Sequence, residues 1–407
     1  MQFVLILLTI LLMPSICSAA TIEITDSRAT PEYWINRNPH GDKVLINSQQ
    51  IVRLNAQILA KDSLTVDLSS LSEVMSADEV NAIIKRAEDD FYNGSHRVSG
   101  DVNVRYAVTT RRGNIRLLPQ AWNGDKYDDL QGTAIDPAEA VAVLCDSPDG
   151  NFAFVQSRNY TGWLDKSDIA FTNRKIWLSY VKPQDFLVVT ANKKVIEVAG
   201  QSVLFQMGSI IPISGTRSKG QGASEEFVAR IPTSVNGELK EVKIGISSAN
   251  KDLNRGFLAC TENNFIRQAF KFLGDEYGWG GLNDSVDCSA FVQDVYRSMG
   301  INIPRDTGNQ RGCMPIWAVF NNVTNAERWD IVSRAPIGSL LHKPGHVMMK
   351  LGNDADGRPL IIHAASSYLD EDSGKVYIRK VIVSDLHYRG GAIETIDALT
   401  DIVFYGD

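Results

Sequence analysis

The spacing of hydrophobic and polar positions changes character three times along the chain. Residues 21–97 carry mainly helical and loop-like patterns. Ser76 followed by Glu79 forms a capping box, and hydrophobic residues then recur at helical spacing, so we expect a packing helix there. The earlier stretch PEYWINRNPHGD, from Pro31, has aromatic residues without a regular period. We expect it to be an extended segment that lies on another domain.

Short β-rich runs dominate the middle of the chain. Over residues 98–173, alternating runs are separated by Gly, Asn and Asp, a pattern that favours a small antiparallel barrel or sandwich. A second block over residues 174–250 also predicts strands, in IWLSYV, FLVVT, KVIEVAG, SVLFQMGSIIPI, EEFVARIP and VKIGIS. The two blocks share no clean sequence repeat, so a duplication is inferred from pattern only.

From about residue 251 a helical pattern returns and strands follow it, which is the order of an α+β domain. Thr261 is expected to cap a first helix that stops at Gly274. The run SAFVQDVYRSMG then places its hydrophobic residues on one face and stops at Gly300. This second helix is predicted to begin at Cys288.

Length and composition limit the class of protein. At 407 residues, the chain exceeds the roughly 250–300 residues that one hydrophobic core usually serves, so several domains are expected. The hydrophobic share of 44% and the charged share of 22% are ordinary for globular proteins. The net charge of −7 comes without a cluster of Lys and Arg, which argues against nucleic acid as a ligand.

The N-terminus predicts export. An uncharged apolar run over residues 3–13 is followed by CSAA, which resembles a secretory signal cleaved after Ala19 or Ala20. The alternatives are an uncleaved anchor or a buried N-terminal helix. Lipid attachment at Cys17 is not expected, because the isoleucine before it is bulkier than such sites normally carry. We therefore expect a protein of the periplasm or cell envelope, without an integral membrane segment after signal removal.

Four cysteines remain once the signal is removed. They form no CxxC pair, so neither a zinc site nor a dithiol redox motif is expected. Disulfides among Cys145, Cys260 and Cys313 stay open, although a chain of this size does not need them to fold.

Cys288 has the surroundings of a nucleophile. The thiolate is the reactive form, and the free thiol pKa of about 8.5 must fall for reaction at neutral pH. Asp287, Cys288 and Ser289 lie where a helix is predicted to begin, so unsatisfied N–H groups and the helix dipole favour the thiolate. The preceding GWGG would let backbone approach a substrate closely. The alternative is a buried cysteine on an amphipathic helix.

A nucleophilic cysteine needs a base, normally histidine, which a third group orients. His346 begins the run HVMMKLG and His363 ends the run PLIIH, so both are predicted on adjacent antiparallel strands. His342 precedes Pro-Gly and is predicted in a loop. Taken singly, either strand histidine would more often be a satisfied core residue than a catalyst. Three other histidines lie in polar stretches and are predicted at the solvated surface: His40, His96 and His387.

The motifs YGWGG, DCSAF, PRDTGNQ, GHVMMKLG and IIHAAS stand in one order over residues 255–407. Together they resemble the NlpC-type peptidoglycan peptidases, whose papain-like domain presents a D-C-S nucleophile, a G-H-V base and a third polar group. Upstream, RLLPQAW, YDDLQG, DGNFAFVQS and GWLDKSDIA resemble the bacterial SH3-type barrels that precede this domain in one branch of the family. PEYWI resembles the N-terminal stabilising region of that branch.

This resemblance implies an α+β papain-like catalytic domain preceded by two small all-β SH3-type barrels and a helical or extended N-terminal region. The turn spacing of the second barrel block matches poorly, which leaves its role open. The expected division of the chain is a signal peptide at 1–20, a helical stabilising region at 21–97, barrels at 98–173 and 174–250, and a peptidase domain at 251–407.

Enzymes of that branch are similar to γ-D-glutamyl-L-diamino acid endopeptidases, which cut stem peptides that carry a free N-terminal L-Ala. The resemblance implies Cys288 as the nucleophile, His346 as the general base and then acid, and His363 as its orienter. Tyr277 would contribute to the oxyanion region. The implied reaction is acyl transfer to the thiolate and needs no metal or organic cofactor.

The resemblance also implies a substrate pocket. Asp287 and Ser289 would bind the α-ammonium of the substrate, and Asp306 is a further candidate in the same pocket. A charge-assisted bond to a buried carboxylate would make a free amine a selectable feature. The first barrel would close the pocket where a glycan would otherwise continue, through Tyr127 and Asp128 of YDDLQG. The alternative for those two residues is an ordinary barrel loop.

Two other functions stay open. One is a non-catalytic cell-wall binding protein, against which the intact set of Cys288, His346 and His363 argues. The other is an amidase or acyltransferase on the same scaffold, which only substrate profiling would separate from a peptidase. The sequence leaves open which diamino acid is preferred, whether intact wall or released peptides are cut, and the oligomeric state.

Overall fold

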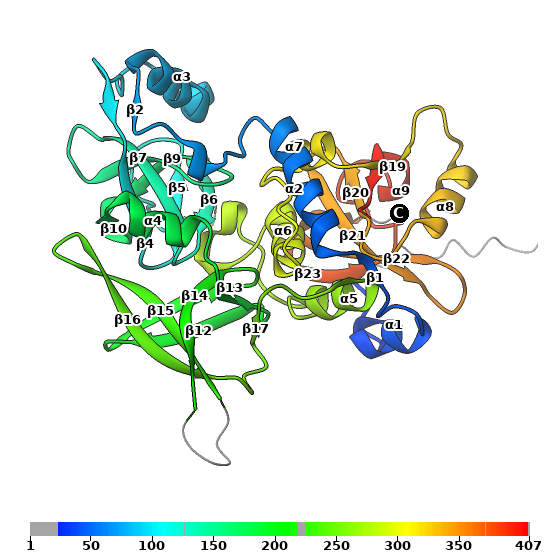
Figure 1. The fold of residues 1–407 in the computed structure, drawn as a ribbon. Coiled ribbons are helices and arrows are strands. Elements are labelled where there is room, and N and C mark those ends of the chain that lie inside the picture. Colours follow the sequence, from blue (N-terminus) through cyan, green and yellow to red (C-terminus); the bar gives the residue numbers. More distant parts are fainter. Residues whose placement is uncertain (1–22, 126, 219–224, 371, 406–407) are drawn as a thin grey trace, which may run out of the picture.

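The computed structural model describes residues 23–125, 127–218, 225–370 and 372–405. The predicted signal peptide, with Cys17, lies outside these residues. Figure 1 shows β-rich parts on the left and a mixed part on the right, with N-terminal helices lying against both. Within the described residues, no helix has both the length and the apolar character needed to cross a bilayer.

The N-terminal region packs on two different parts of the protein. Trp34 and Ile58 lie in the same core as the C-terminal domain, whereas Val80 and Ile84 lie in the core of the β-rich parts. The capping box at Ser76 is present, as predicted. PEYWINR is a helix and not the extended segment predicted, because Pro31 occupies its first position and Trp34 is buried on one face. The helices and strands are α1 (Pro31–Arg37), β1 (Val44–Ile46), α2 (Ser48–Lys61), β2 (Val74–Met75) and α3 (Ala77–Glu88).

The first β block forms short antiparallel strands, as its pattern predicts. The strands pair in the order β10-β4-β7-β8-β9-β5-β6. Their alternating residues fill a core around Phe154 and Trp163 on one side, and around Val143 and Leu164 on the other. The strands are β3 (Val102–Asn103), β4 (Arg105–Thr109), β5 (Gly113–Arg116), β6 (Gln131–Ile135), β7 (Ala140–Asp146), β8 (Phe152–Gln156), β9 (Thr161–Asp165) and β10 (Ile169–Thr172).

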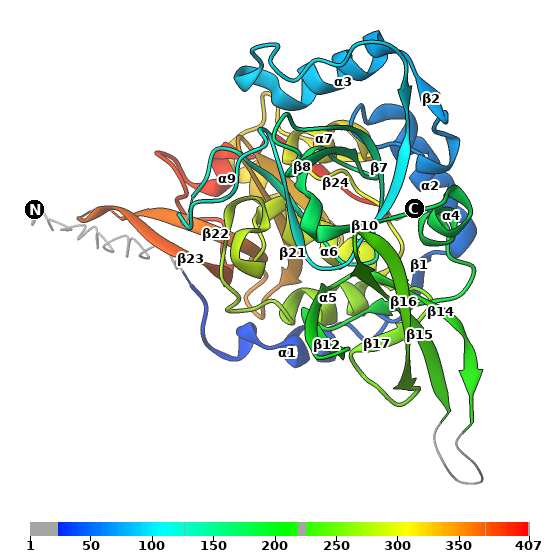
Figure 2. The same cartoon turned by 90° about the vertical axis from the view of Figure 1, so that its left-hand side faces the viewer.

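The second β block continues the sheet of the first. Strand β16 pairs with β10 in parallel, through Phe171 and Glu238. Long strands β14, β15 and β16 extend away from the C-terminal domain (Figure 2). The run IWLSYV is a helix and not a strand, because Asn173 caps it and Trp177 and Val181 are buried at helical spacing. The elements are α4 (Arg174–Val181), β11 (Phe186–Val189), β12 (Lys193–Val198), β13 (Gln201–Gln206), β14 (Ile210–Arg217), β15 (Glu226–Val235), β16 (Glu238–Ser247) and β17 (Leu253–Arg255).

The C-terminal domain is built on a six-stranded antiparallel sheet in the order β19-β24-β20-β21-β22-β23. One face packs on α5 and α6, with Val347 and Ile362 in that core. The other face packs on α8 and α9, with Leu341 and Met348 in that core. The elements are β18 (Cys260–Thr261), α5 (Glu262–Phe270), α6 (Cys288–Ser298), α7 (Thr307–Cys313), β19 (Ile316–Val319), α8 (Asn325–Arg334), β20 (Leu340–Lys343), β21 (His346–Asn353), β22 (Pro359–Asp370), β23 (Gly374–Ser384), α9 (Thr395–Ala398) and β24 (Asp401–Val403).

Candidate active site

Helix α6 begins at Cys288, as predicted from the sequence. The Asp287 side chain caps it by accepting a hydrogen bond of 2.8 Å from the Ala290 N–H. Cys288 is 7% exposed, and the backbone N–H of Val347 donates to its sulfur. The sulfur lies 3.9 Å from the hydroxyl of Thr307. The thiol therefore sits between the start of a helix and the strand that begins with His346.

The surroundings of Cys288 correct the expectation of a lowered thiol pKa. Burial and the neighbouring Asp287 carboxylate raise the pKa of Cys288 to about 11, although Val347, Thr307 and Arg305 act in the opposite direction. Desolvation penalises the charged thiolate more than these donors stabilise it. The substrate-free site therefore holds a neutral thiol at pH 7, and a base must take its proton during attack.

His346 and His363 lie on adjacent antiparallel strands, as predicted. Nε2 of His346 is 2.8 Å from Nδ1 of His363, and Nε2 of His363 is 3.1 Å from the Ser384 hydroxyl. Burial lowers the pKa of His346 well below its ordinary value, and burial lowers that of His363 to about 3. Both rings are therefore neutral at pH 7. With the His346 proton on Nε2, its Nδ1 is left to accept a proton.

The remaining histidines correct three predictions. His342 lies in strand β20 and not in a loop, where it is buried with Nδ1 3.0 Å from Asp401. His96 is 12% exposed and not a solvated surface residue, because its ring contacts Trp163 and Nδ1 lies 2.6 Å from Glu88. His40 is exposed at the surface, as predicted, whereas His387 is half-buried, with Nδ1 2.8 Å from Glu394 and its ring against Trp329.

Asp287 is held by Arg305, a residue that the sequence analysis did not single out. The guanidinium donates two hydrogen bonds to the carboxylate, of 2.7 and 3.1 Å, and one of 2.8 Å to the Ser289 hydroxyl. The N–H groups of Gly280 and Ala290 and the Ser289 hydroxyl, at 3.2 Å, also donate to the Asp287 carboxylate. Burial alone would raise the pKa of Asp287, but Arg305 keeps it below its ordinary value. Asp287 and Ser289 thus lie beside Cys288, with their hydrogen-bonding capacity already in use.

Asp306 differs from Asp287 in having no such partner. It stands before helix α7 without capping it, and among the described residues none donates a hydrogen bond to its carboxylate. Burial, together with the charges of Asp287 and Asp62, raises its pKa. Tyr160, from the first β block, lies close to Asp306. Burial raises the pKa of the Tyr160 hydroxyl, and the Asp306 charge raises that pKa further. These properties favour a cation at Asp306.

Aromatic residues line another side of the site. Tyr277 is mostly buried, and burial followed by the charges of Cys288 and Asp287 raises its pKa, so its hydroxyl stays protonated and can donate. Tyr127 is 55% exposed and its ring centroid lies 5.4 Å from that of Trp279. Asp128 instead accepts a hydrogen bond of 2.7 Å from Arg116 and stays within the first β block. Of the two candidate residues in YDDLQG, Tyr127 contacts the C-terminal domain and Asp128 does not.

The glycines of GWGG allow the first β block to approach, and not only a substrate as the sequence suggested. A Cβ added at Gly280 would lie 2.5 Å from Gln131, and one at Gly281 would lie 2.9 Å from Ala134. Both glycines have positive φ, of 60° and 79°, which side-chain-bearing residues rarely adopt. Gln131 also donates to the Gly280 carbonyl at 3.1 Å. The first β block is therefore docked directly beside Cys288.

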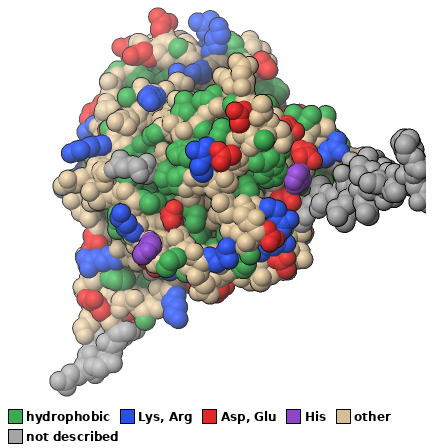
Figure 3. All heavy atoms as spheres, turned by 90° about the vertical axis from the view of Figure 1, so that its right-hand side faces the viewer, with side chains coloured by type: hydrophobic (Ala, Val, Ile, Leu, Met, Phe, Trp, Pro, Cys, Tyr) green, Lys and Arg blue, Asp and Glu red, His purple; other side chains and the backbone are tan. Residues whose placement is uncertain are grey.

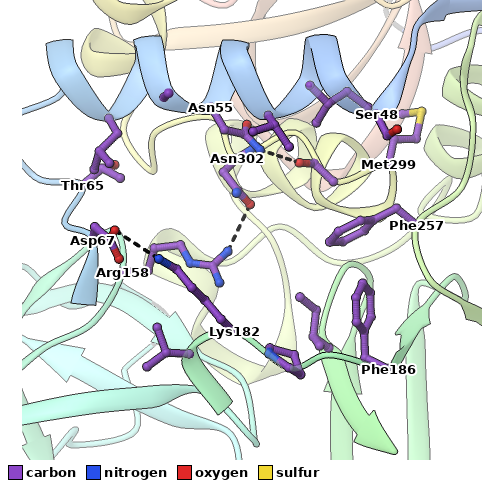
Figure 4. A pocket seen from close by; sticks show the side chains of 18 of the residues that line it. Ser48, Asn55, Thr65, Asp67, Arg158, Lys182, Phe186, Phe257, Met299 and Asn302 are labelled. Atoms are coloured by element: carbon purple, nitrogen blue, oxygen red, sulfur yellow. Dashed lines mark hydrogen bonds and ion pairs between the residues drawn. The ribbon is translucent and has the colours of Figure 1, made fainter. Parts of the chain in front are cut away.

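A separate cavity of about 1000 Å³ lies where the N-terminal helix α2, both β blocks and the C-terminal domain meet. Figure 4 shows Asn55 and Asn302 on its wall, with Arg158 donating to Asn302 at 3.2 Å and Lys182 paired with Asp67. None of the predicted catalytic residues lines it.

The four described cysteines, Cys288 included, are all unpaired. Figure 3 shows acidic and basic side chains interspersed on the face in view.

Comparison with known proteins agrees with this geometry. Residues 274–381 match the model of the NlpC/P60 family, and residues 118–165 match an SH3 domain of the SH3b1 type. The chain therefore contains an NlpC/P60 domain preceded by an SH3b domain. The second β block, residues 174–250, lies outside both matches, so its assignment as an SH3-type barrel stays a prediction.

Individual proteins resemble the chain over a short stretch of sequence or over most of the fold. The chain is 39% identical over 51 residues to the γ-D-glutamyl-L-lysine dipeptidyl-peptidase of Bacillus subtilis strain 168, a match that covers 12% of this chain and 17% of that protein. An NlpC/P60 endopeptidase structure from Photobacterium damselae subsp. piscicida has a TM-score of 0.71 at 16% identity, covering 95% of this chain and 98% of that one. An NlpC/P60 family structure from Bacillus cereus ATCC 10987 has a TM-score of 0.52 at 16% identity, covering 74% and 100%. At these identities the structures establish a shared fold alone.

Proposed function

We propose that this protein is a cysteine peptidase that cleaves the γ-D-Glu–diamino acid bond of peptidoglycan stem peptides with a free N-terminal L-Ala. The observation that carries the proposal is the placement of Cys288 at a helix start, beside the neutral His346–His363 pair and under the docked SH3b domain. The NlpC/P60 match and the short likeness to a γ-D-glutamyl peptidase support the same class of substrate.

In the proposed mechanism the thiol is activated only when substrate is bound. Nδ1 of His346 takes the proton as the Cys288 sulfur attacks the γ-carbonyl carbon of D-Glu. The Tyr277 hydroxyl donates to the developing oxyanion. The protonated His346 then gives its proton to the leaving amine, and water hydrolyses the thioester. His363 and Ser384 hold the His346 ring in the tautomer that this sequence needs.

The proposed ammonium site reverses the order of the candidates. Asp287 is neutralised by Arg305, whereas Asp306 carries a charge that burial penalises until a cation arrives. We place the substrate ammonium at Asp306, with Tyr160 and Tyr127 forming the SH3b side of the pocket. A pocket closed by the SH3b domain admits a short free peptide and excludes a stem peptide still joined to glycan.

The proposal predicts strong selection for a free amine. N-acetylation of L-Ala-γ-D-Glu-diaminopimelate should lower kcat/KM at least ~30-fold, since removal of one partner of a buried charge pair costs about 2 kcal/mol or more. Steady-state release of L-Ala-γ-D-Glu measures both rates. Asp306→Asn should remove most of this preference by slowing only the free-amine substrate. Equal rates on both peptides would show that no ammonium site exists, and absence of cleavage of either would refute the proposed function.

The pH dependence of the reaction should reflect the buried base. Burial and the neighbouring His363, Lys343 and His342 hold the pKa of His346 well below 6.5. A lowered pKa keeps the imidazole neutral, and therefore able to accept a proton, as the pH falls through 6.5. We expect kcat/KM for the tripeptide to stay level between pH 7.5 and 6.5. A half-maximal rate at or above pH 6.5 would contradict this.

A further inference from the structure

Lys343 is a half-buried cation beside the proposed catalytic histidine, and the mechanism above does not use it. It ends strand β20, and a Pro-Gly turn leads back to His346, with which it forms a cross-strand pair. Cross-strand partners share one face of a sheet with Cβ atoms about 5 Å apart. The side chains of Lys343 and His346 therefore leave the sheet side by side.

The ammonium of Lys343 has donors to spare. It donates one hydrogen bond, of 3.1 Å, to the Thr395 hydroxyl and lies 5.8 Å from the centroid of the Tyr388 ring. An ammonium has three N–H donors, and no carboxylate of the described residues forms an ion pair with this one. Lys350 differs from Lys343 in this respect. Lys350 is buried and donates to two backbone carbonyls, at 2.7 and 2.5 Å. Lys350 holds the fold together, whereas Lys343 is left with capacity for a ligand.

Lys343 lies within electrostatic reach of the reacting groups. Burial lowers its pKa to about 8, and the charge of Cys288 acts against that shift. Lys343 in turn contributes to the lowered pKa of both His346 and His363. At pH 7 it is therefore still charged. Figure 1 places β20 and α9 on the side of α6 opposite to the SH3b domain.

These positions define two sides of Cys288. In the proposed function the acyl part, L-Ala-γ-D-Glu, extends from Cys288 toward the SH3b domain. The leaving residue must extend the other way, with its amine beside His346, which protonates it. Lys343 is a cation on that side whose charge acts on His346 and is acted on by Cys288. A leaving residue of this kind carries an α-carboxylate, and diaminopimelate has a second carboxylate at the end of its side chain, where lysine has only an ammonium.

We propose that Lys343 binds a carboxylate of the leaving diamino acid and so selects diaminopimelate over lysine at this position. The inference rests on the proposed function and deepens it. The side-chain carboxylate is the one that distinguishes the two diamino acids. Amidating the α-carboxyl group, which both diamino acids carry, tests this: binding of the diaminopimelate peptide is unchanged if Lys343 binds the side-chain carboxylate, whereas binding of both peptides weakens if Lys343 binds the α-carboxylate.

The kinetic test compares three leaving groups on L-Ala-γ-D-Glu, namely diaminopimelate, lysine and the uncharged p-nitroaniline. Lys343→Met should raise KM for the diaminopimelate peptide roughly 30-fold, as expected for loss of one charge from a buried pair, and change anilide cleavage by less than about 3-fold. Lys343→Arg should restore most of the loss, and Lys375→Met, which removes an exposed lysine of the same domain, should change nothing. An equal loss on all three substrates would mean that Lys343 acts on Cys288 or His346 instead, and no loss would also overturn the proposal.

A binding test separates this inference from the proposed function. Calorimetric titration of the Cys288→Ala protein with the diaminopimelate tripeptide needs no turnover. Adding Lys343→Met should weaken binding by a similar factor, while binding of the lysine peptide stays as it was. Failure of the enzyme to cleave any of the three substrates would refute the peptidase assignment alone. Unchanged binding of the diaminopimelate peptide would refute the carboxylate site.

Discussion

Replacing Cys288 with alanine should lower kcat/KM for L-Ala-γ-D-Glu-diaminopimelate by at least ~10⁴-fold, the scale on which loss of a nucleophile acts in enzymes of this kind. The physical reason is that the sulfur forms the acyl bond in the proposed mechanism, and the other described thiols lie in β7, in β18 and at the end of α7. Residual cleavage could come only from binding and oxyanion stabilisation. Release of L-Ala-γ-D-Glu, followed by chromatography over long incubations, measures so large a loss.

The control for this substitution is Cys145→Ala, which removes a half-buried thiol of the first β block. It should keep the rate within about 3-fold. The free energy of unfolding of both variants, measured in denaturant, should stay within about 1 kcal/mol of that of the parent. Turnover above a few per cent in the Cys288 variant would remove the thiol from the mechanism. Complete inactivity of the parent on every stem peptide would instead favour a non-catalytic role in cell-wall binding.

The local parts of the site could be predicted from sequence because their signals are local. A helix start at Cys288 needs only Asp287 as its cap and a hydrophobic face behind it. The two strands that carry the histidines follow from short hydrophobic runs, one that begins at His346 and one that ends at His363. The order of helices and strands in residues 251–407 follows in the same way, from periodicity and stop residues.

The parts that failed depend on contacts between segments far apart in the chain. PEYWINR and IWLSYV have aromatic and β-branched residues that favour strands in isolation, but the burial of Trp34 and Trp177 against other elements makes them helical. The raised pKa of Cys288 depends on how completely the fold covers it, which periodicity does not report. Tyr160 reaches the site only because the SH3b domain docks there, and nothing in its own stretch of sequence indicates this.

Arg305 is the missed residue with the largest expected effect. It stands inside the motif PRDTGNQ, next to Asp306, whose carboxylate suits an ammonium ligand. The side chain of Arg305 is 4% exposed, and it links Asp287 and Ser289 to the Thr133 hydroxyl of the SH3b domain, at 2.7 Å. One buried guanidinium thus links the helix cap beside Cys288 to the neighbouring SH3b domain.

Arg305→Met should therefore lower the free energy of unfolding by about 3–5 kcal/mol, because it leaves the Asp287 carboxylate buried without its countercharge. Unfolding in denaturant is followed by loss of the proposed peptidase activity, which reports the C-terminal domain, and by tryptophan fluorescence, which also reports the β blocks through Trp163 and Trp177. The exposed pair of Arg334 and Asp330, at 64% and 65% exposure, supplies the matched control. Arg334→Met should cost no more than about 0.5 kcal/mol, since solvent-exposed ion pairs contribute little.

A double-mutant cycle then tests the reason for the loss. Asp287→Asn removes the charge that Arg305 balances but keeps an oxygen that can accept from the Ala290 N–H. Combined with Arg305→Met, it should recover about 1–3 kcal/mol relative to the sum of the two single effects, the coupling expected for residues in direct contact. Additive losses would show that Arg305 acts through packing and its bond to Thr133, and not through the charge of Asp287. A loss below about 1 kcal/mol for Arg305→Met alone would show that helix α6 does not depend on this ion pair.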